Sequence, residues 1–316
     1  MKIQSTLFIE IDNFDFFFVV ASFENESQFK LLFRNSVPIE GIHNGQITDI
    51  KSILNIFKKN IYTIEQKLNL VFKEVVLVVS NSDNPIINIS GYKKLSGSQL
   101  VKENITYILN SLKSKISEIE KEKTILHIFN SKYNLDNKEL KNLPIGLFGD
   151  FYSHELSFFL INSYDYKNLI DILNKCNLKV KKIISKKFID GVNLINENLG
   201  VETFVKIEIN KNNSQIIYFQ NSSLKFFEDF KFGSDIILND ISKIIGLEIE
   251  NVREILINTD FSNPKSREEF IKKNFFRVGH YKEIKKELIF EIASARIKEL
   301  SEIILFKNIN LDFFIK

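Results

Sequence analysis

The sequence predicts a mixed α/β chain with two similar lobes, because a strand–turn–strand pattern near its start recurs about two hundred residues later. In residues 203–219, alternate positions from Val205 to Ile209 are apolar, and an Asn-rich turn separates them from a second apolar run. This period of two is typical of a strand with one buried face, and Asn tolerates the left-handed backbone of hairpin turns. Residues 6–20 repeat the pattern around the turn Asp12–Asp15. Two unrelated hairpins could share this pattern, so the recurrence alone leaves that alternative open.

The first part of the chain alternates strands with one helix. Residues 5–34 predict a three-stranded meander, and Thr48 or Asp49 is expected to cap a helix that runs to about Asn69. The uninterrupted apolar run 75–79 is typical of a strand that is buried on both faces. The polar cluster at 80–85 then indicates a loop and a candidate domain boundary.

The following segments predict an insert and a second, more helical part. The expected elements of the insert are a strand at 86–89, a helix at 98–120 and strands at 124–130, 132–135 and 156–161. The later elements are a helix after Ser163, a strand at 180–184, a helix at 189–196, the second hairpin, a helix from Asp235 that Gly246 closes, a long helix at 282–306 and a final strand at 309–315.

The composition argues against several classes of protein. The 43 basic and 40 acidic residues give a net charge of +3, too balanced to argue for nucleic acid as a partner. Cys176 is the only cysteine, so no internal disulfide is expected. No apolar run approaches the ~18 residues of a membrane span, and no signal peptide is expected. The four histidines lack metal-ligand spacing, and the lysines at 181–182 and 186–187 are expected to form a solvated surface.

Four strings occur in an order that is typical of one protein family. They are residues 36–49 with two glycines before Ile47-Thr48-Asp49, the strand Leu126-His127-Ile128-Phe129, a loop with Asp136, Pro144 and Gly146, and the turn Lys175–Val180. Together they resemble the family of the bacterial cell-division protein FtsA, which has an actin-like fold. The resemblance covers nearly the whole chain.

The resemblance implies an α/β, two-lobed actin-like (ribonuclease H-like) ATPase fold with an inserted strand–helix–strand–strand (SHS2) module. The implied domains are a first lobe at 1–81 and 157–195, the SHS2 module at 82–156, the start of a second lobe at 196–226, its helical subdomain at 227–306, and a final strand at 307–316 that leaves the second lobe truncated.

Actin-like ATPases hold the phosphates of ATP on two glycine-rich turns, because glycine lets backbone N–H groups approach the phosphates. By resemblance, the matching positions are Glu10 and Asp12 in the first hairpin and Glu208, Asn212 and Asn213 in the second. Neither turn keeps a glycine, and the carboxylates of the first turn would repel polyphosphate. We therefore expect a degenerate fold that is not an enzyme, with no catalytic residue, no metal site and no cofactor, neither ATP nor Mg²⁺.

The expected function is that of an adaptor of the bacterial cell-division machinery, the divisome, without ATP turnover. By resemblance, the helical subdomain would bind the C-terminal tail of the tubulin-like ring protein FtsZ through Asp235, Asn239, Arg296 and Glu299. The guanidinium of Arg296 could pair with two oxygens of an acidic tail. Other division proteins and self-association are further expected contacts. The alternatives are a PilM-like cytoplasmic platform of pilus assembly and an active actin-like ATPase.

The expected location is the cytoplasm, at the inner face of the cell membrane at the division site. Members of the FtsA family attach to the membrane through an amphipathic C-terminal helix, whose apolar face enters the boundary of the acyl chains. Residues 307–316 alternate like a strand. We therefore expect this chain not to bind the membrane directly but to reach it through partners.

Overall fold

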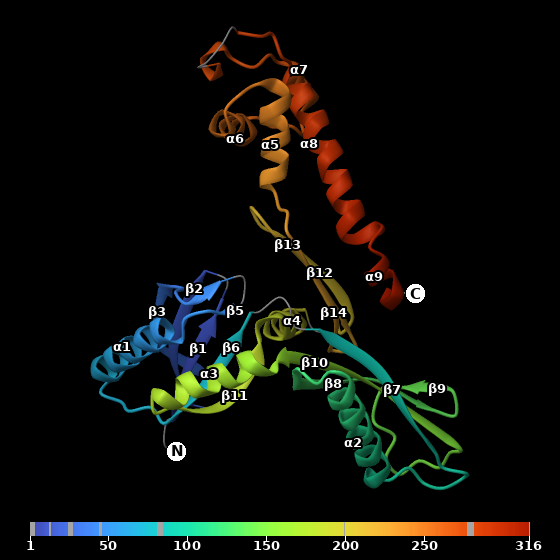
Figure 1. Ribbon diagram of the computed structural model, residues 1–316. Helices are drawn as coiled ribbons and strands as arrows, with labels where there is room; N and C mark the ends of the chain where they lie inside the picture. Colours follow the sequence, from blue (N-terminus) through green and yellow to red (C-terminus); the bar gives the residue numbers. More distant parts are fainter. Residues whose placement is uncertain are drawn as a thin grey trace. The chain divides into compact units, whose positions relative to one another are not determined.

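The computed structural model describes residues 4–12, 14–24, 28–43, 46–80, 85–198, 200–276 and 281–315. The contacts divide the chain into two compact units (Figure 1). Unit 1 comprises Met1–Phe204 and Phe219–Lys225, and unit 2 comprises Val205–Tyr218 and Phe226–Lys316. Each unit is therefore assembled from two separate stretches of the chain.

Unit 1 contains a five-stranded sheet in the order β11-β6-β1-β2-β3. Its strands are β1 (Gln4–Ile11), β2 (Asp15–Phe23), β3 (Phe29–Pro38), β6 (Glu74–Val79) and β11 (Lys179–Ser185). The first three strands pair in antiparallel, which confirms the predicted meander, whereas β1, β6 and β11 run parallel. The carboxyl ends of these parallel strands therefore meet at one edge of the sheet, where α/β proteins commonly bind ligands.

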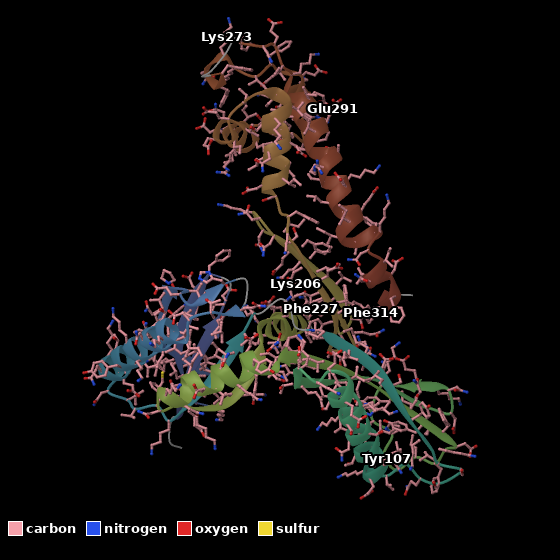
Figure 2. All side chains as sticks on the ribbon, viewed as in Figure 1. Tyr107, Lys206, Phe227, Lys273, Glu291 and Phe314 are labelled. Atoms are coloured by element: carbon pink, nitrogen blue, oxygen red, sulfur yellow. The ribbon has the colours of Figure 1, made fainter. Side chains whose placement is uncertain are left out.

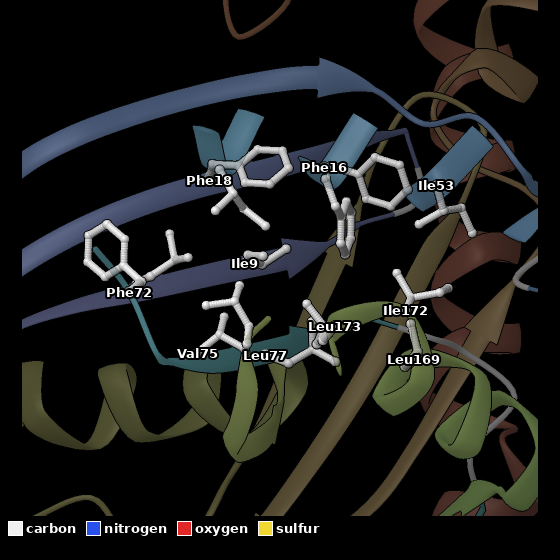
Figure 3. Close-up of a cluster of buried hydrophobic side chains, with 14 of the residues drawn as sticks. Ile9, Phe16, Phe18, Ile53, Phe72, Val75, Leu77, Leu169, Ile172 and Leu173 are labelled. Carbon is white, nitrogen blue, oxygen red and sulfur yellow. The ribbon is translucent and has the colours of Figure 1, made fainter. Parts of the chain in front are cut away.

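Two helices, α1 (Ile50–Leu68) and α3 (Ser163–Lys175), share a hydrophobic core with this sheet (Figure 3). Phe16 and Phe18 of β2 are fully buried, as the period of two predicts. The ring of Phe57 on α1 meets both of them edge-on, with centroids 5.1 and 5.6 Å apart. Such aromatic contacts contribute to stability beyond the area that they bury.

Short segments connect these layers. The strands β4 (Ile42–His43) and β5 (Gln46–Ile47) form a two-stranded ribbon before α1. The carboxylate of Asp49 then accepts hydrogen bonds from two backbone N–H groups of the first turn of α1, which confirms the predicted cap. Helix α4 (Lys186–Glu197) follows β11 directly.

The second sheet of unit 1 is antiparallel, in the order β7-β10-β8-β9. Its elements are β7 (Ile86–Lys94), α2 (Lys102–Ile119), β8 (Lys123–Leu135), β9 (Lys138–Leu140) and β10 (Phe151–Asn162). The strands expected at 124–130 and 132–135 are one strand with a register shift at Ser131. Gly91 lets α2 approach the sheet, because a Cβ there would lie 2.4 Å from the side chain of Ile108.

A third sheet contains the second predicted hairpin. Its strands, in spatial order, are β12 (Phe204–Ile209), β13 (Ser214–Gln220) and β14 (Ser223–Phe230). Both predicted hairpins, at 6–20 and at 203–219, are thereby confirmed. Asn221 and Ser222 join β13 to β14 with φ angles of 51° and 59°, the left-handed backbone of the preferred hairpin turns.

The rest of unit 2 is helical. Its elements are α5 (Asp235–Ile245), α6 (Ile249–Asn258), α7 (Pro264–Glu268), a 3₁₀ turn (Lys273–Phe275), α8 (Lys286–Ser301), a π-helical segment (Glu302–Phe306) and α9 (Ile309–Ile315). Gly246 ends α5 with a φ of 72°, as predicted. Ile241, Val252 and Ile289 form the core shared by α5, α6 and α8.

The end of the chain is helical, so the strand predicted for 307–316 is wrong. The side chain of Asn308 accepts a hydrogen bond from the Leu311 N–H at 2.9 Å, at the start of α9. A helix turns Leu311 and Phe314 toward one side, where they pack with Ile216 and Tyr218. Phe314 is labelled near the end of the chain in Figure 2. A strand would instead place residues 311, 313 and 315 on one face. The tertiary contact therefore overrides the alternating pattern.

Candidate functional site

The turn between β1 and β2 is the first predicted phosphate-binding position. The Asp12 N–H donates a hydrogen bond to the Asp15 carbonyl oxygen at 3.1 Å. Glu10 lies on β1, and Asn13 lies outside the described residues. The turn therefore places carboxylates at the edge where β1, β6 and β11 end.

A lysine that we expected on a solvated surface is electrostatically coupled to these carboxylates. The Nζ atom of Lys186 pairs with Oδ1 of Asp190, one turn along α4, at 2.5 Å. Burial would lower the pKa of this lysine, but Asp190, together with the charges of Glu10 and Asp12, raises it. The neighbouring Lys187 is only 5% exposed, so the predicted solvated cluster at 186–187 is wrong. The spacing of four residues between Lys186 and Asp190 indicates that they pair on a helix. Nothing in the sequence around them indicates the coupling of Lys186 with Glu10 of β1.

The turn between β12 and β13 is closed by the start of α5. The carbonyl oxygens of Asn210 and Lys211 accept hydrogen bonds from the N–H groups of Ser234 and Asp235, at 2.8 and 2.9 Å. Gly233 allows this approach, because a Cβ there would lie 2.1 Å from the Asn210 carbonyl oxygen. The backbone donors at the start of α5, which could otherwise bind an anion, are therefore used within unit 2.

The predicted site residues of this hairpin make local contacts. Glu208 accepts a hydrogen bond from Gln215 on the neighbouring strand. The carbonyl oxygen of Asn213 accepts a hydrogen bond from the Asn210 N–H at 2.9 Å, and Asn212 is exposed.

The residues at the two turns do not fit a Mg²⁺–polyphosphate group. A phosphate loop offers free backbone N–H groups and cations to the anion. At the first turn, the charged groups are carboxylates, and the nearby Lys186 is paired with Asp190. At the second turn, the N–H groups of Ser234 and Asp235 donate to the carbonyl oxygens of the turn itself. The carboxylates of the first turn and the use of the Ser234 and Asp235 N–H groups at the second are therefore unfavourable for a phosphate.

The predicted partner-binding residues lie on α5 and α8, which pack together. Arg296 of α8 donates through Nε to Asp240 of α5 and through Nη1 to Glu299, both at 2.5 Å. Asp235 instead lies 4.0 Å from an arginine of α6, and Asn239 is exposed. Of the four predicted residues, the structure therefore brings Arg296 and Glu299 together. It also adds Asp240, which the sequence analysis missed because Arg296 and Asp240 lie on different helices.

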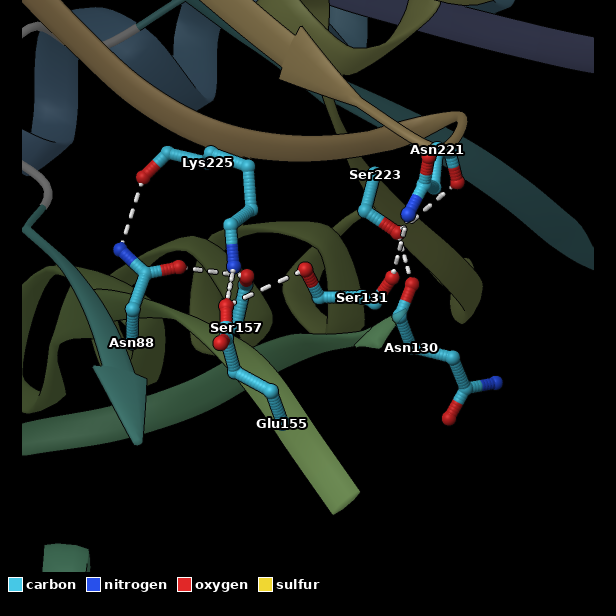
Figure 4. Close-up of polar contacts among 8 residues, drawn as sticks. All are labelled: Asn88, Asn130, Ser131, Glu155, Ser157, Asn221, Ser223 and Lys225. Carbon is cyan, nitrogen blue, oxygen red and sulfur yellow. Dashed lines mark hydrogen bonds and ion pairs between the residues drawn. The ribbon is translucent and has the colours of Figure 1, made fainter. Parts of the chain in front are cut away.

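A buried polar network in unit 1 fixes the β13–β14 turn to the antiparallel sheet (Figure 4). The side chain of Lys225 is only 2% exposed, and its ammonium group pairs with Glu155 of β10. Glu155 also accepts a hydrogen bond from Ser131 at 3.3 Å, and Asn88 donates to the Lys225 carbonyl oxygen at 2.9 Å. Removing one partner of such a pair would leave a buried charge uncompensated, so the network specifies where this turn docks.

An open pocket of about 730 Å³ shares Ser131 with this network. Phe129 of β8 and Phe188 of α4 form an apolar wall, with ring centroids 4.7 Å apart. Glu139 and Asn221 contribute polar groups from β9 and from the β13–β14 turn. The spacing of apolar residues along the sequence does not predict this pocket, because its walls come from separate segments of the chain.

The two histidines of the antiparallel sheet, His127 and His154, are half-buried and buried, respectively. His154 is 3% exposed, and neither ring nitrogen has a hydrogen-bond partner among the described residues. Burial lowers its pKa to about 4, and burial also lowers the pKa of His127 to about 4. Within the part of the chain that the structure describes, which excludes His280, no cluster of His, Cys, Asp and Glu could hold a metal ion.

The sheets, the inserted strand–helix–strand–strand module and the paired hairpins define the class of protein, which has an actin-like ATPase fold. Among solved structures, the chain is similar to the PilM–PilN type IV pilus biogenesis complex, with a TM-score of 0.52 and 11% identity. The similarity covers 98% of this chain and 77% of that chain. At this identity the likeness shows the fold alone, and the predicted fold class is confirmed.

In sequence, the chain is similar to FtsA, a cell division protein. No family model matches it. The FtsA of Buchnera aphidicola subsp. Schizaphis graminum is 22% identical over 84% of this chain, and that of Buchnera aphidicola subsp. Baizongia pistaciae is 25% identical over 72%. The FtsA of Escherichia coli K12 is 19% identical over 67%. The matches cover 63%, 53% and 50% of these relatives, so the chain spans about half to three-fifths of their length. The predicted resemblance is confirmed as a similarity to FtsA at 19–25% identity.

Proposed function

We propose that this chain is an adaptor of the bacterial cell-division machinery that binds FtsZ and links it to other division proteins at the membrane. The observation that carries the proposal is the similarity to FtsA, which extends over 84% of the chain. The absence of ATP turnover is part of the proposal, and it is supported by the paired Lys186 at the first turn and the occupied N–H groups at the second. The domain limits given above, with the module at 82–156, are likewise proposed.

The proposed FtsZ-binding surface lies on α5 and α8. The guanidinium of Arg296 lies between two carboxylates, those of Asp240 and Glu299. A carboxylate of the acidic FtsZ tail would replace one of them, most readily Glu299, whose side chain is 53% exposed. Ile297, next in the chain, is 52% exposed and offers an apolar contact beside the charge. Self-association of the chain is a further proposed contact.

The test is binding of a fluorescent FtsZ C-terminal peptide to the purified chain, measured by anisotropy. Arg296→Ala should weaken binding about tenfold, which corresponds to ~1.4 kcal/mol. The matched control is Arg267→Ala, because Arg267 pairs with Glu287 of α8 at 3.5 Å but lies outside the proposed surface. Equal affinities of wild type and Arg296→Ala would remove this residue from the site. A wild-type chain that does not bind the peptide would refute the role in FtsZ binding.

A PilM-like platform of pilus assembly is the second candidate function. It is favoured by the structural similarity to the PilM–PilN complex, which covers 98% of this chain. Parallel titrations with an FtsZ tail peptide and a PilN peptide separate the two functions, because each predicts binding of only one peptide. Hydrolysis of ATP by the purified chain would instead support the third alternative, an active ATPase.

We propose that the chain works at the inner face of the cell membrane at the division site and reaches the membrane through partners. In the described residues, no helix has the length and apolar character needed to span a bilayer. The expectation that the chain does not bind the membrane rested partly on a strand at its end, but this segment is the helix α9. Ile309 (85% exposed) and Phe313 (81% exposed) lie on α9 and could contact a membrane. Flotation with anionic vesicles tests whether the chain binds a membrane directly, and we expect it to stay unbound. Flotation that is lost in Ile309→Asp/Phe313→Asp would show direct binding through α9.

A further inference from the structure

Unit 1 contains a pocket to which the proposed function assigns no role. It is the open pocket of about 730 Å³ described above, a size that is typical of sites for small molecules, and we call it the β8 pocket. Its lining residues come from β8, β9, α4, the β13–β14 turn and Glu202, all within unit 1. The site is therefore distinct from the two hairpin turns and from the proposed FtsZ-binding surface.

Hydrogen bonds join the walls of the β8 pocket to one another. The side chain of Asn221 donates to the Ser131 carbonyl oxygen at 3.0 Å, and the Ser223 hydroxyl donates to that of Asn130 (Figure 4). These bonds fix the β13–β14 turn on β8, and β9 pairs with β8 in antiparallel on the other side. The walls are thus in place before a ligand binds, which lowers the entropic cost of binding.

The apolar wall of the β8 pocket consists of two aromatic rings. The ring centroids of Phe129 and Phe188 are 4.7 Å apart, and the ring planes are tilted by 32°. Both side chains are half-buried, so part of each ring remains accessible. The face of an aromatic ring carries a negative potential, so it attracts cations and the edges of other planar groups.

The charged residues that line the β8 pocket are two glutamates and one lysine. Glu139 and Lys141, at β9 and just after it, are exposed, and so is Glu202. The backbone holds Glu202 beside the β13–β14 turn, since its carbonyl oxygen accepts a hydrogen bond from the Ser222 N–H at 2.8 Å. Two carboxylates against one ammonium group leave a net negative charge, which favours a positively charged ligand over an anion.

We propose that the β8 pocket binds a small organic cation. The flat apolar body of such a molecule would lie against Phe129 and Phe188, and its amidinium, guanidinium or ammonium group would pair with Glu139 or Glu202. A ligand in this pocket also touches the β13–β14 turn, so its binding strengthens the docking of that turn on β8. This inference is independent of the proposed binding of FtsZ.

The probe for the experiment is benzamidine, a flat aromatic amidinium, and benzoate is its control because it has a similar size and the opposite charge. Each is titrated into the full chain with labelled methyl groups, and nuclear magnetic resonance follows Ile128 and Leu140, which both line the pocket. We expect benzamidine to shift these two methyl signals with a Kd on the order of 1 mM. Benzoate should bind at least about tenfold more weakly.

Variants of the pocket should change the affinity for benzamidine in opposite directions. Glu139→Gln/Glu202→Gln should weaken binding about tenfold, whereas Lys141→Gln should strengthen it about threefold by removing a like charge. Phe129→Leu keeps an apolar wall but loses the aromatic face, so it should weaken binding about threefold. The matched control is Glu118→Gln, because Glu118 is exposed on α2 and does not line the pocket.

Three outcomes would overturn the proposal. The first is a wild-type chain whose Ile128 and Leu140 methyl signals do not respond to benzamidine at about 10 mM. The second is benzoate that binds as tightly as benzamidine, because charge would then not select the ligand. The third is an affinity that neither Glu139→Gln/Glu202→Gln nor Lys141→Gln changes. Since these three residues are exposed, the variants should keep the wild-type melting temperature, and unfolding would not explain a loss of binding.

Discussion

The two hairpin turns have the same sequence pattern and are each closed by a backbone hydrogen bond of their own, from Asp12 to Asp15 and from Asn210 to Asn213, but different groups act on them from outside. At the first turn, between β1 and β2, a lysine from α4 is coupled to the carboxylates. At the second, between β12 and β13, backbone N–H groups at the start of α5 donate to the carbonyl oxygens of the turn. Both turns lack glycine, so the composition of the turns does not distinguish them. The difference comes from distant segments: the charge of Lys186 is coupled to the first turn, and Gly233 lets the start of α5 approach the second.

The largest effect is expected at the second turn. Gly233→Ala would place a Cβ 2.1 Å from the Asn210 carbonyl oxygen and 2.5 Å from that of Lys211, both backbone atoms. The backbone would have to shift and lose its hydrogen bonds, which should lower the free energy of unfolding by about 3 kcal/mol. Urea unfolding measures the loss. The control Gly246→Ala meets no atom within 4 Å and should cost only ~1 kcal/mol, from its φ of 72°. Equal losses would mean that the close approach at Gly233 does not matter.

A smaller effect, in acid, should separate the two units. The pKa of His154 is lowered to about 4, below its ordinary value of 6.5, so the unfolded chain binds a proton first as the pH falls. Stability is therefore lost as the pH falls from 6.5 to 4, because the unfolded chain takes up the proton first. Hydrogen exchange should show that β8 and β10 lose protection before α5, because the backbone hydrogen bonds of the second turn do not titrate.

His154→Phe should reduce this acid sensitivity, since the phenyl ring can pack beside Tyr133 and Tyr152 without taking up a proton. Replacement of the exposed His43 by Asn is the control and should leave the acid response unchanged. Earlier loss of protection in α5 than in β10 would contradict the contrast between the units.

The smallest effect tests the charge of Lys186, which is coupled to the first turn. Asp190→Asn removes the partner of Lys186 and should cost about 1 kcal/mol, reduced by the 36% exposure of the lysine side chain. Asp171→Asn breaks the exposed pair on α3 and should cost less than ~0.5 kcal/mol. The difference should shrink in high salt, which screens charges. Equal costs in chemical denaturation would show that Lys186 and Asp190 form only a surface pair.

Local signals were sufficient for most of the fold. The period of two predicted both hairpins, and the meander at 5–34 followed from the same alternation. Asp49 and Gly246 marked helix ends because caps depend on neighbouring residues only. Alternation misled at the end of the chain, where Leu311 and Phe314 follow a helical spacing into a core formed with β13.

The candidate site was less predictable, because its interactions join distant segments. The resemblance to FtsA directed attention to Glu10 and Arg296, but it did not provide their partners. Lys186 lies 176 residues after Glu10 in the sequence, and Asp240 lies 56 residues before Arg296. No pattern within a window of 20 residues connects such pairs. The absence of glycine in the turns was visible in the sequence, whereas the distant groups that act on them, Lys186 and the start of α5, were found only in the structure.

The crossing of the chain between the units affects the order in which the protein can fold during synthesis. Unit 1 contains Phe219–Lys225, but residues 205–218, which precede that stretch on the ribosome, belong to unit 2. The amino-terminal unit therefore cannot complete its polar network with Glu155 until Lys225 has left the exit tunnel. At a synthesis rate of about 5–20 residues per second, the sheets of unit 1 wait a second or more after Phe204 for their last segment. A chaperone that binds nascent chains would encounter unit 1 in this unfinished state.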